Sequence, residues 1–241
     1  PTRRYSSAAS DVYKRQVTTT VRINAGWDSA SLDLDAAVIP GVSALHLALC
    51  EDPDHVRKVA DRVSQLETER GIAPGTIRLI AMLESPAALL IAREIATASP
   101  RMAGLTLGME DYATTMGTTP NADLLRPACY QITQAARAAG IAPLAVPASM
   151  ANFRDAEEME SAAGWARRIG AVGGYAVHPV QVEILNRVFA PSEEEIAWAH
   201  RVVEAAAKAK REGAGVFTVD GKMVDLPIIT RAHDIIGRQP G

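Results

Sequence analysis

Short apolar runs alternate with helix-like segments along this chain, and this alternation constrains the fold more than any other feature. The runs are short and nearly all apolar, as strands are when both faces of a parallel sheet are covered. Between two of them, residues 54–70 carry apolar side chains at helical spacing after an acidic start, and Gly71 closes the segment. This pattern predicts an α/β fold with a parallel sheet. The strand-like runs cover residues 17–24, 44–49, 76–83, 102–108, 142–146 and 174–177.

Two architectures could hold these strands. An open doubly wound sheet carries a phosphate-binding G-x-G-x-x-G turn after a strand, and no such turn follows any run here. A complete eightfold barrel has two more strands and typically needs roughly 250 residues before extensions. We therefore predict an α/β fold of the (β/α)8 TIM-type barrel that lacks its first two strand–helix units and carries a C-terminal helical and hairpin extension.

The expected domain organisation has three parts. Residues 1–16 are rich in Ser, Arg and Ala and lack the apolar stretch of a signal peptide, so we expect either non-native sequence or a disordered native tail. Residues 17–190 would form the partial barrel, the catalytic domain. Residues 191–241 would form the extension, with a helix over 192–211, a hairpin around Asp220-Gly221 and a short final helix over 228–236.

Composition narrows the classes of partner. The net charge of −3 comes from interspersed charges, which gives no basic footprint for nucleic acid. No apolar run approaches the roughly 20 residues that cross a bilayer. Cys50 and Cys129 lie far apart without a C-x-x-C companion, so neither a zinc site nor a disulfide framework is indicated. We expect a cytoplasmic protein with neither nucleic-acid nor membrane partners.

Two of the apolar runs end in a carboxylate. Glu84 follows the run 76–83, and Asp111 follows the next run along the chain. If both runs are neighbouring parallel strands, these side chains lie at the same sheet edge and can share a hard cation such as Mg²⁺, with Mn²⁺ as the alternative. The alternative reading makes Glu84 an acid at a helix N-terminus and Asp111 a cap for a helix that starts at Tyr112. Glu110 ranks second to Asp111, because adjacent side chains point in different directions.

Arg22 and His178 are the other candidates for chemistry. Arg22 ends the first run, where its guanidinium could clamp a substrate carboxylate or stabilise an enolate, or could simply form a surface ion pair. His178 ends the sixth run and could bind substrate, transfer a proton, or orient its own loop. No G-x-S-x-G elbow or similar nucleophile motif is present.

Several segments, taken together, resemble the HpcH/HpaI aldolase family, and within it the citrate lyase beta subunit-like CoA ester lyases. They run in the family's order and cover most of the chain after residue 16. The His-Pro-x-Gln segment and the Asp-Gly-Lys-Met tail favour the CoA ester lyase branch over the sugar-acid aldolases. The matching segments are residues 21–24, 82–85, 108–117, 135–141, 176–181 and 220–225.

The resemblance implies a lyase that cleaves or forms a carbon–carbon bond. It implies a (β/α)8 barrel in which Glu84 and Asp111 bind Mg²⁺ and Arg22 contacts the substrate. The substrate would be a 3-hydroxyacyl-CoA thioester such as malyl-CoA or citramalyl-CoA, divided into an acyl-CoA and a 2-oxo acid. It further implies a homo-oligomer.

The chain also departs from the family's pattern. Residues 49–52 replace a Pro-Lys pair, Gly174-Tyr175 replaces a Gly-Lys pair, and Pro147 takes the place of an aspartate. Two alternatives therefore stay open. One is a CoA-independent aldolase for 2-oxo-3-deoxy acids, and the other is a catalytically weak paralogue that acts as a binding protein or as a subunit of a complex.

Overall fold

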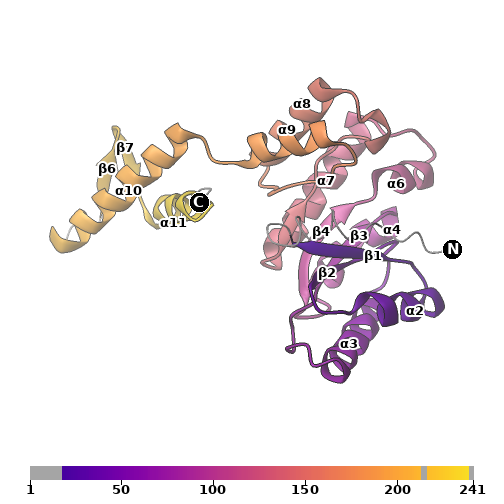
Figure 1. Ribbon diagram of the computed structural model, residues 1–241. Coiled ribbons are helices and arrows are strands. Elements are labelled where there is room, and N and C mark those ends of the chain that lie inside the picture. The colour runs from indigo at the N-terminus through magenta and orange to yellow at the C-terminus, as the bar shows by residue number, and fades with distance from the viewer. Residues whose placement is uncertain (1–17, 213–215, 239–241) are drawn as a thin grey trace. The chain divides into compact units, whose positions relative to one another are not determined.

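The computed structural model describes residues 18–212 and 216–238 (Figure 1). The predicted tail over residues 1–16 lies outside the described residues. The chain divides into two compact units, a larger one that ends at Val182 and a smaller one that starts at Glu183. Helix α9 (Pro179–Phe189) runs through the boundary. In the part of the chain that the structure describes, no helix is long and apolar enough to span a membrane.

The larger unit is built on a five-stranded parallel sheet whose strands follow one another in chain order. This confirms the predicted α/β fold with a parallel sheet. The order never reverses, as it would at the switch point of a doubly wound sheet, and it matches a section of a (β/α) barrel. Closure of a barrel stays a prediction. The strands are β1 (Thr19–Ile23), β2 (Val42–Leu47), β3 (Arg78–Leu83), β4 (Met102–Leu107) and β5 (Ala142–Leu144).

The prediction of a sixth strand over residues 174–177 is wrong. This segment is irregular, and the backbone bond to β5 lies just before it, from the Val172 N–H to the Pro143 carbonyl at 3.0 Å. Gly173 precedes the segment and Gly174 begins it, and glycine weakens a strand because it adds chain entropy and no side-chain packing. Residues 171–178 therefore form a loop beside β5.

Several helices of the larger unit, among them α3 and α7, begin at side-chain caps that the sequence supplies. The Asp52 carboxylate accepts a hydrogen bond from the Asp54 N–H at 2.9 Å, and Asn121 caps α7 in the same way. The helix predicted over residues 87–98 is instead two short helices that break at Ile91. The helices are α2 (Trp27–Ala37), α3 (Pro53–Glu69), α4 (Pro86–Leu90), α5 (Ala92–Ala96), α6 (Met109–Thr115), α7 (Ala122–Ala138), the 3₁₀ turn η1 (Met150–Asn152) and α8 (Ala156–Arg168).

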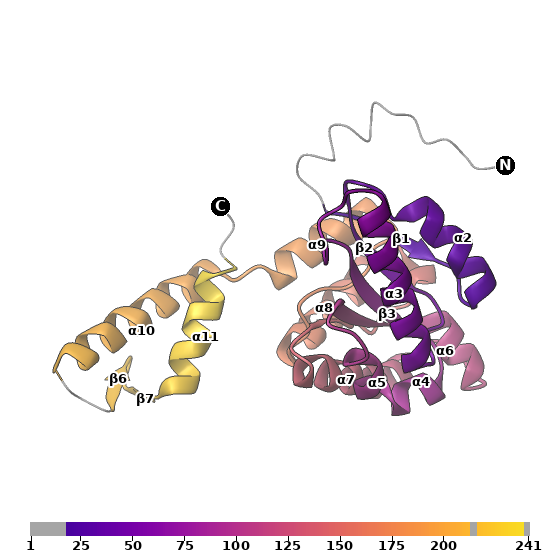
Figure 2. The same cartoon turned by 90° about the horizontal axis from the view of Figure 1, so that it is seen from below.

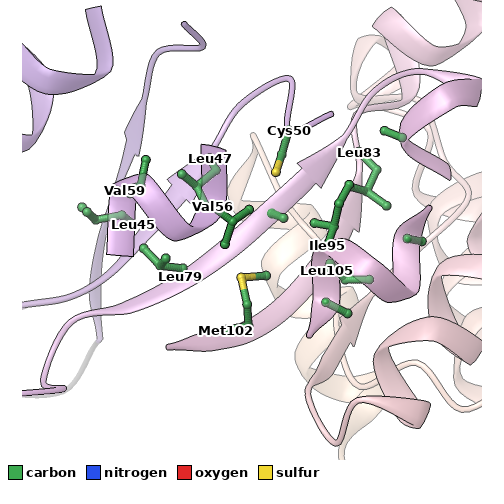
Figure 3. Packing of buried hydrophobic residues seen from close by; sticks show 14 of the residues in the cluster. Leu45, Leu47, Cys50, Val56, Val59, Leu79, Leu83, Ile95, Met102 and Leu105 are labelled. Carbon is green, nitrogen blue, oxygen red and sulfur yellow. The ribbon is translucent and has the colours of Figure 1, made fainter. Parts of the chain in front are cut away.

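One face of the sheet carries the hydrophobic core. Helices α3, α5 and α7 pack against this face (Figure 2). Figure 3 shows the core side chains of β2, β3 and β4 meeting those of α3 and α5. Successive strand residues point to opposite faces, so residues such as Arg22 and His46 lie on the other side of the sheet. The core at this contact includes Leu45, Leu47, Val56, Val59, Leu79, Leu83, Ile95 and Leu105.

A buried ion pair fixes the amino ends of β3 and β4. Arg101 donates two hydrogen bonds to the Glu67 carboxylate, at 3.0 and 2.6 Å. The same carboxylate accepts the backbone N–H groups of Gly75 and Ile77, at 2.9 and 2.8 Å. Arg101 also donates to the Ile77 carbonyl at 3.0 Å and to the Ser64 hydroxyl at 2.9 Å. This network joins α3 to the start of both strands.

The smaller unit is a helical pair with a hairpin. It contains α10 (Glu193–Glu212), β6 (Phe217–Val219), β7 (Lys222–Val224) and α11 (Leu226–Ile236). Ser192 and Glu195 form a reciprocal capping box at the start of α10, with bonds of 3.1 and 2.7 Å. The predicted hairpin is confirmed, since β6 and β7 pair antiparallel around Asp220 and Gly221, both at positive φ. Its small core contains Ala199, Val202, Val219, Val224 and Ala232.

Removal of the Glu67 carboxylate is expected to destabilise the fold strongly. Glu67→Ala leaves the Arg101 guanidinium buried without its partner, and breaking a buried pair in this way costs about 3–5 kcal/mol. Urea denaturation of the variant and the parent measures the difference in their free energies of unfolding. Glu69→Ala on the same helix is the control, because its contact with Arg62 spans 3.7 Å at the surface and is worth about 1 kcal/mol at most. Equal losses of unfolding free energy in the two variants would contradict the stabilising role of the ion pair between Glu67 and Arg101.

Candidate metal centre

A cavity of about 270 Å³ opens at the carboxyl ends of the strands. Arg22 reaches it from β1, Glu84 directly after β3, and Asp111 from the first turn of α6, which follows β4. The structure thus brings the three predicted residues together in the lining of one cavity. Its described lining comprises Arg22, Met82, Glu84, Leu107, Gly108, Met109, Glu110, Asp111, Met150, Tyr175, Ala176 and Val177.

The two carboxylates of the cavity lie close enough to perturb one another. Glu84 is 5% exposed, whereas Asp111 is exposed. Burial raises the pKa of the Glu84 carboxyl to about 7, and the hydrogen bond and charge of Asp111 act in the same direction. The Leu49 N–H and the positive charge of Arg22 oppose this rise in pKa. Two carboxyl groups in this relation favour a shared proton or a shared cation.

The buried Glu84 side chain is positioned by two backbone features. The Leu49 N–H donates to Glu84 Oε1 at 3.3 Å, from a residue held at φ 44°, which is unusual for a leucine. Gly108 lies against the other side of Glu84, where a Cβ atom would stand 2.5 Å from Cγ. Such a contact is far inside van der Waals range. Glycine at position 108 is therefore required for this placement of Glu84.

Asp111 and Glu110 have different surroundings. Asp111 lies inside the first turn of α6, which starts at Met109, so the alternative reading of Asp111 as a cap for a helix that starts at Tyr112 is wrong. Glu110 Oε1 accepts a hydrogen bond from the Ser149 hydroxyl at 2.5 Å, which ties α6 to the loop that contains η1. Asp111 is thus the better candidate for pairing with Glu84.

The donor set fits a hard divalent cation. Carboxylate oxygens are the ligands that Mg²⁺ and Mn²⁺ prefer, and Mg²⁺ usually takes one or two of them together with water and substrate oxygens. Within residues 18–212 and 216–238, no group of three or more His, Cys, Asp or Glu side chains is arranged to hold a metal. A cation held by Glu84 and Asp111 would keep several coordination positions for small ligands.

His178 does not line the cavity. Its backbone N–H and that of Val177 donate to Gln181 Oε1, and its Nδ1 accepts the Val180 N–H at 3.3 Å. The ring also lies 5.4 Å from the ring of Phe153. These contacts favour the structural alternative for His178, in which it shapes the start of α9.

Sequence patterns did not indicate two residues of the cavity, Gly108 and Tyr175, as functional candidates. Gly108 directly follows a strand, and a glycine at that point signals close approach of other atoms. Tyr175 belongs to the loop beside β5, and its hydroxyl meets a histidine that lies 129 residues away in the chain. No local sequence pattern reports such a contact.

Comparison with known proteins agrees with the resemblance. The family model "HpcH/HpaI aldolase/citrate lyase" matches residues 5–179. The chain is 35% identical over 227 residues to the citrate lyase subunit beta of Haemophilus influenzae, covering 93% of this chain and 77% of that protein. It is 34% identical over 193 residues to the L-malyl-CoA/beta-methylmalyl-CoA lyase of Rhodobacter capsulatus, covering 72% of this chain and 60% of that protein.

Among solved structures, the fold is similar to protein CitE from Mycobacterium tuberculosis in complex with magnesium, acetoacetate and coenzyme A. The TM-score is 0.69 and the identity 28%, over 96% of this chain and 83% of that one.

Substitution of Gly108 is expected to impair cation binding. In Gly108→Ala the new methyl group must displace the Glu84 side chain, so Mn²⁺ affinity, measured by electron paramagnetic resonance titration, should fall about 10-fold or more. Gly164→Ala on α8 is the matched control, because its Cβ would meet only Arg168 Nη1 at 3.6 Å. Unchanged Mn²⁺ affinity in Gly108→Ala would refute this positioning role.

Proposed function

Because this chain belongs to the HpcH/HpaI aldolase/citrate lyase family, we propose that it is a Mg²⁺-dependent carbon–carbon lyase that acts on a 3-hydroxyacyl-CoA thioester. In the cleavage direction the substrate's hydroxyl proton is released, the carbon–carbon bond breaks, and its electron pair forms an enolate that takes up a proton from solvent. The products are an acyl-CoA and a 2-oxo acid. Malyl-CoA and citramalyl-CoA are the proposed substrates.

The observation that carries this proposal is the meeting of Glu84 and Asp111 in the cavity beside Arg22. When bound, Mg²⁺ would act as a Lewis acid that polarises the oxygens of the 2-oxo acid portion. Glu84 and Asp111 would hold the cation through their carboxylate oxygens. The relative from Mycobacterium tuberculosis was solved with magnesium, acetoacetate and coenzyme A, which supports the same ligand classes for this chain.

Arg22 would supply the fixed positive charge of the site. Its guanidinium offers a planar fork of donors that matches a carboxylate, so it can orient the 2-oxo acid portion. Its charge already lowers the pKa of Glu84 against the effect of burial. The same charge would offset negative charge that develops as the bond breaks.

The apolar lining gives the cavity its second property. Met82, Leu107, Met109, Met150 and Val177 surround the charged groups. Electrostatic interactions are stronger beside apolar groups than in bulk water, so this lining would increase the effect of Arg22 on the substrate. A homo-oligomeric assembly is part of the proposal, as the family resemblance implies.

Two observations favour a second candidate. The first relative is named as a subunit, and no lysine or histidine occurs among the described residues that line the cavity. The chain could therefore serve as the acyl-CoA binding subunit of a larger lyase. Binding of Mg²⁺ and an acyl-CoA without turnover would favour this candidate. Turnover of a CoA-free 2-oxo-3-deoxy acid would instead favour the aldolase alternative.

Activity is expected to depend on the cation and on its two ligands. Malyl-CoA and citramalyl-CoA are incubated with the protein, and the released 2-oxo acid is measured. EDTA should abolish release, and excess Mg²⁺ should restore it. Glu84→Gln and Asp111→Asn should each lower kcat/KM by roughly 100-fold or more, because each removes an anionic ligand.

Glu94→Gln is the matched control, since Glu94 is exposed on α5 and does not line the cavity. Its activity should equal that of the parent. Full activity in EDTA, or in Glu84→Gln, would refute metal-dependent catalysis at this site.

A further inference from the structure

Hydrogen-bond donors are scarce in the cavity. Among the described residues that line it, only Arg22 and Tyr175 have side chains that donate when the carboxyl groups are ionised. Arg22 carries a full charge, whereas the phenol of Tyr175 is a neutral donor. Tyr175 therefore adds a chemical property that the carboxylates and the guanidinium do not supply.

The Tyr175 hydroxyl is held in place by a chain of hydrogen bonds. It lies 2.5 Å from His46 Nδ1, and His46 Nε2 lies 3.0 Å from the Thr20 hydroxyl. The two rings meet edge to face, with centroids 5.4 Å apart and planes at 76°. His46 is 8% exposed on β2 and lies opposite Arg22 of β1 in the sheet register. The phenol thus joins the loop to the sheet face that carries Arg22.

This chain of bonds leaves the phenol one free hydrogen-bonding direction. Burial, and after it the charge of Arg22, lowers the pKa of His46, which favours the neutral ring with one donor and one acceptor nitrogen. When Nδ1 carries the hydrogen, it donates to the Tyr175 oxygen, and Thr20 donates to Nε2. The O–H of Tyr175 is then available to a ligand in the cavity.

We propose that Tyr175 is a catalytic residue that donates a hydrogen bond to the thioester oxygen of the substrate, with His46 and Thr20 as its positioning residues. The thioester oxygen gains negative charge when the electron pair of the broken carbon–carbon bond moves into the enolate. A preorganised donor stabilises this charge without giving up its proton. The inference rests on the proposed lyase function, because it assigns the donor for that reaction.

Tyr175→Phe separates this role from a structural one. The variant keeps the ring that packs on His46 and removes only the hydroxyl. Loss of a donor to a developing oxyanion costs about 100-fold in kcat. We expect kcat to fall by this order while KM and the thermal midpoint stay near those of the parent. Tyr130→Phe is the matched control, since Tyr130 is 48% exposed on α7 and lies outside the cavity lining.

His46→Gln should reduce kcat as well, and combining it with Tyr175→Phe should add little, because both changes remove one oriented donor. An active parent whose Tyr175→Phe variant keeps its kcat would overturn the inference. A variant whose kcat falls together with its thermal midpoint would also overturn it, because that result marks a structural role.

A binding measurement tests the inference without turnover. Acetyl-CoA is added with Mg²⁺ to protein that carries ¹⁵N-labelled histidine. In the parent, the His46 Nδ1 resonance should shift when the phenol bonds to the thioester, and in Tyr175→Phe it should not. An unmoved resonance in a parent that binds acetyl-CoA would overturn the inference. A parent that shows the shift but cleaves no thioester would refute the lyase function and leave the donor role supported.

Discussion

Parallel pairing of strands in chain order is the constraint on which the site depends. Strands that run in the same direction bring their carboxyl ends to a common edge, and so residues that lie 62 and 27 positions apart along the chain, Arg22, Glu84 and Asp111, meet around one cavity. The amino ends of β3 and β4 must be held in place as well, and the buried ion pair between Glu67 and Arg101 holds them. That pair lies far along the strands from the cavity, yet it fixes the strands that deliver Glu84 and Asp111.

Sequence patterns predicted the parts of the structure that local chemistry decides. The runs that became β2 to β4 are mostly buried and apolar, the helix α3 has one apolar stripe, and Asp220-Gly221 lies in the turn of the predicted hairpin. The meeting of Glu84 with Asp111 could also be predicted, because it follows from strand direction alone. The run 174–177 has the apolar character of a strand, but Gly173 and Gly174 at its start weaken strand pairing, and the run is irregular.

Contacts that depend on three-dimensional packing could not be predicted. The bond between Tyr175 and His46, and the approach of Gly108 to Glu84, each need the positions of two segments to within a fraction of an ångström. The break between α4 and α5 is of the same kind, since residues 87–98 are compatible with one continuous helix. The metal-ligand roles of Glu84 and Asp111 and the substrate role of Arg22 are proposals. They rest on the meeting of the three side chains in one cavity.

The close approach of Gly108 to Glu84 also limits the routes by which this protein can change. A side chain at position 108 collides with Glu84 as long as position 84 carries a long carboxylate. A substitution at position 108 displaces the Glu84 side chain, whereas a shorter residue at position 84 removes the atoms with which that side chain would collide. The two positions are therefore epistatic, because the effect of a substitution at one depends on the residue at the other. A single change at either position disturbs the buried carboxylate of Glu84, so the two residues are expected to change together as the protein evolves.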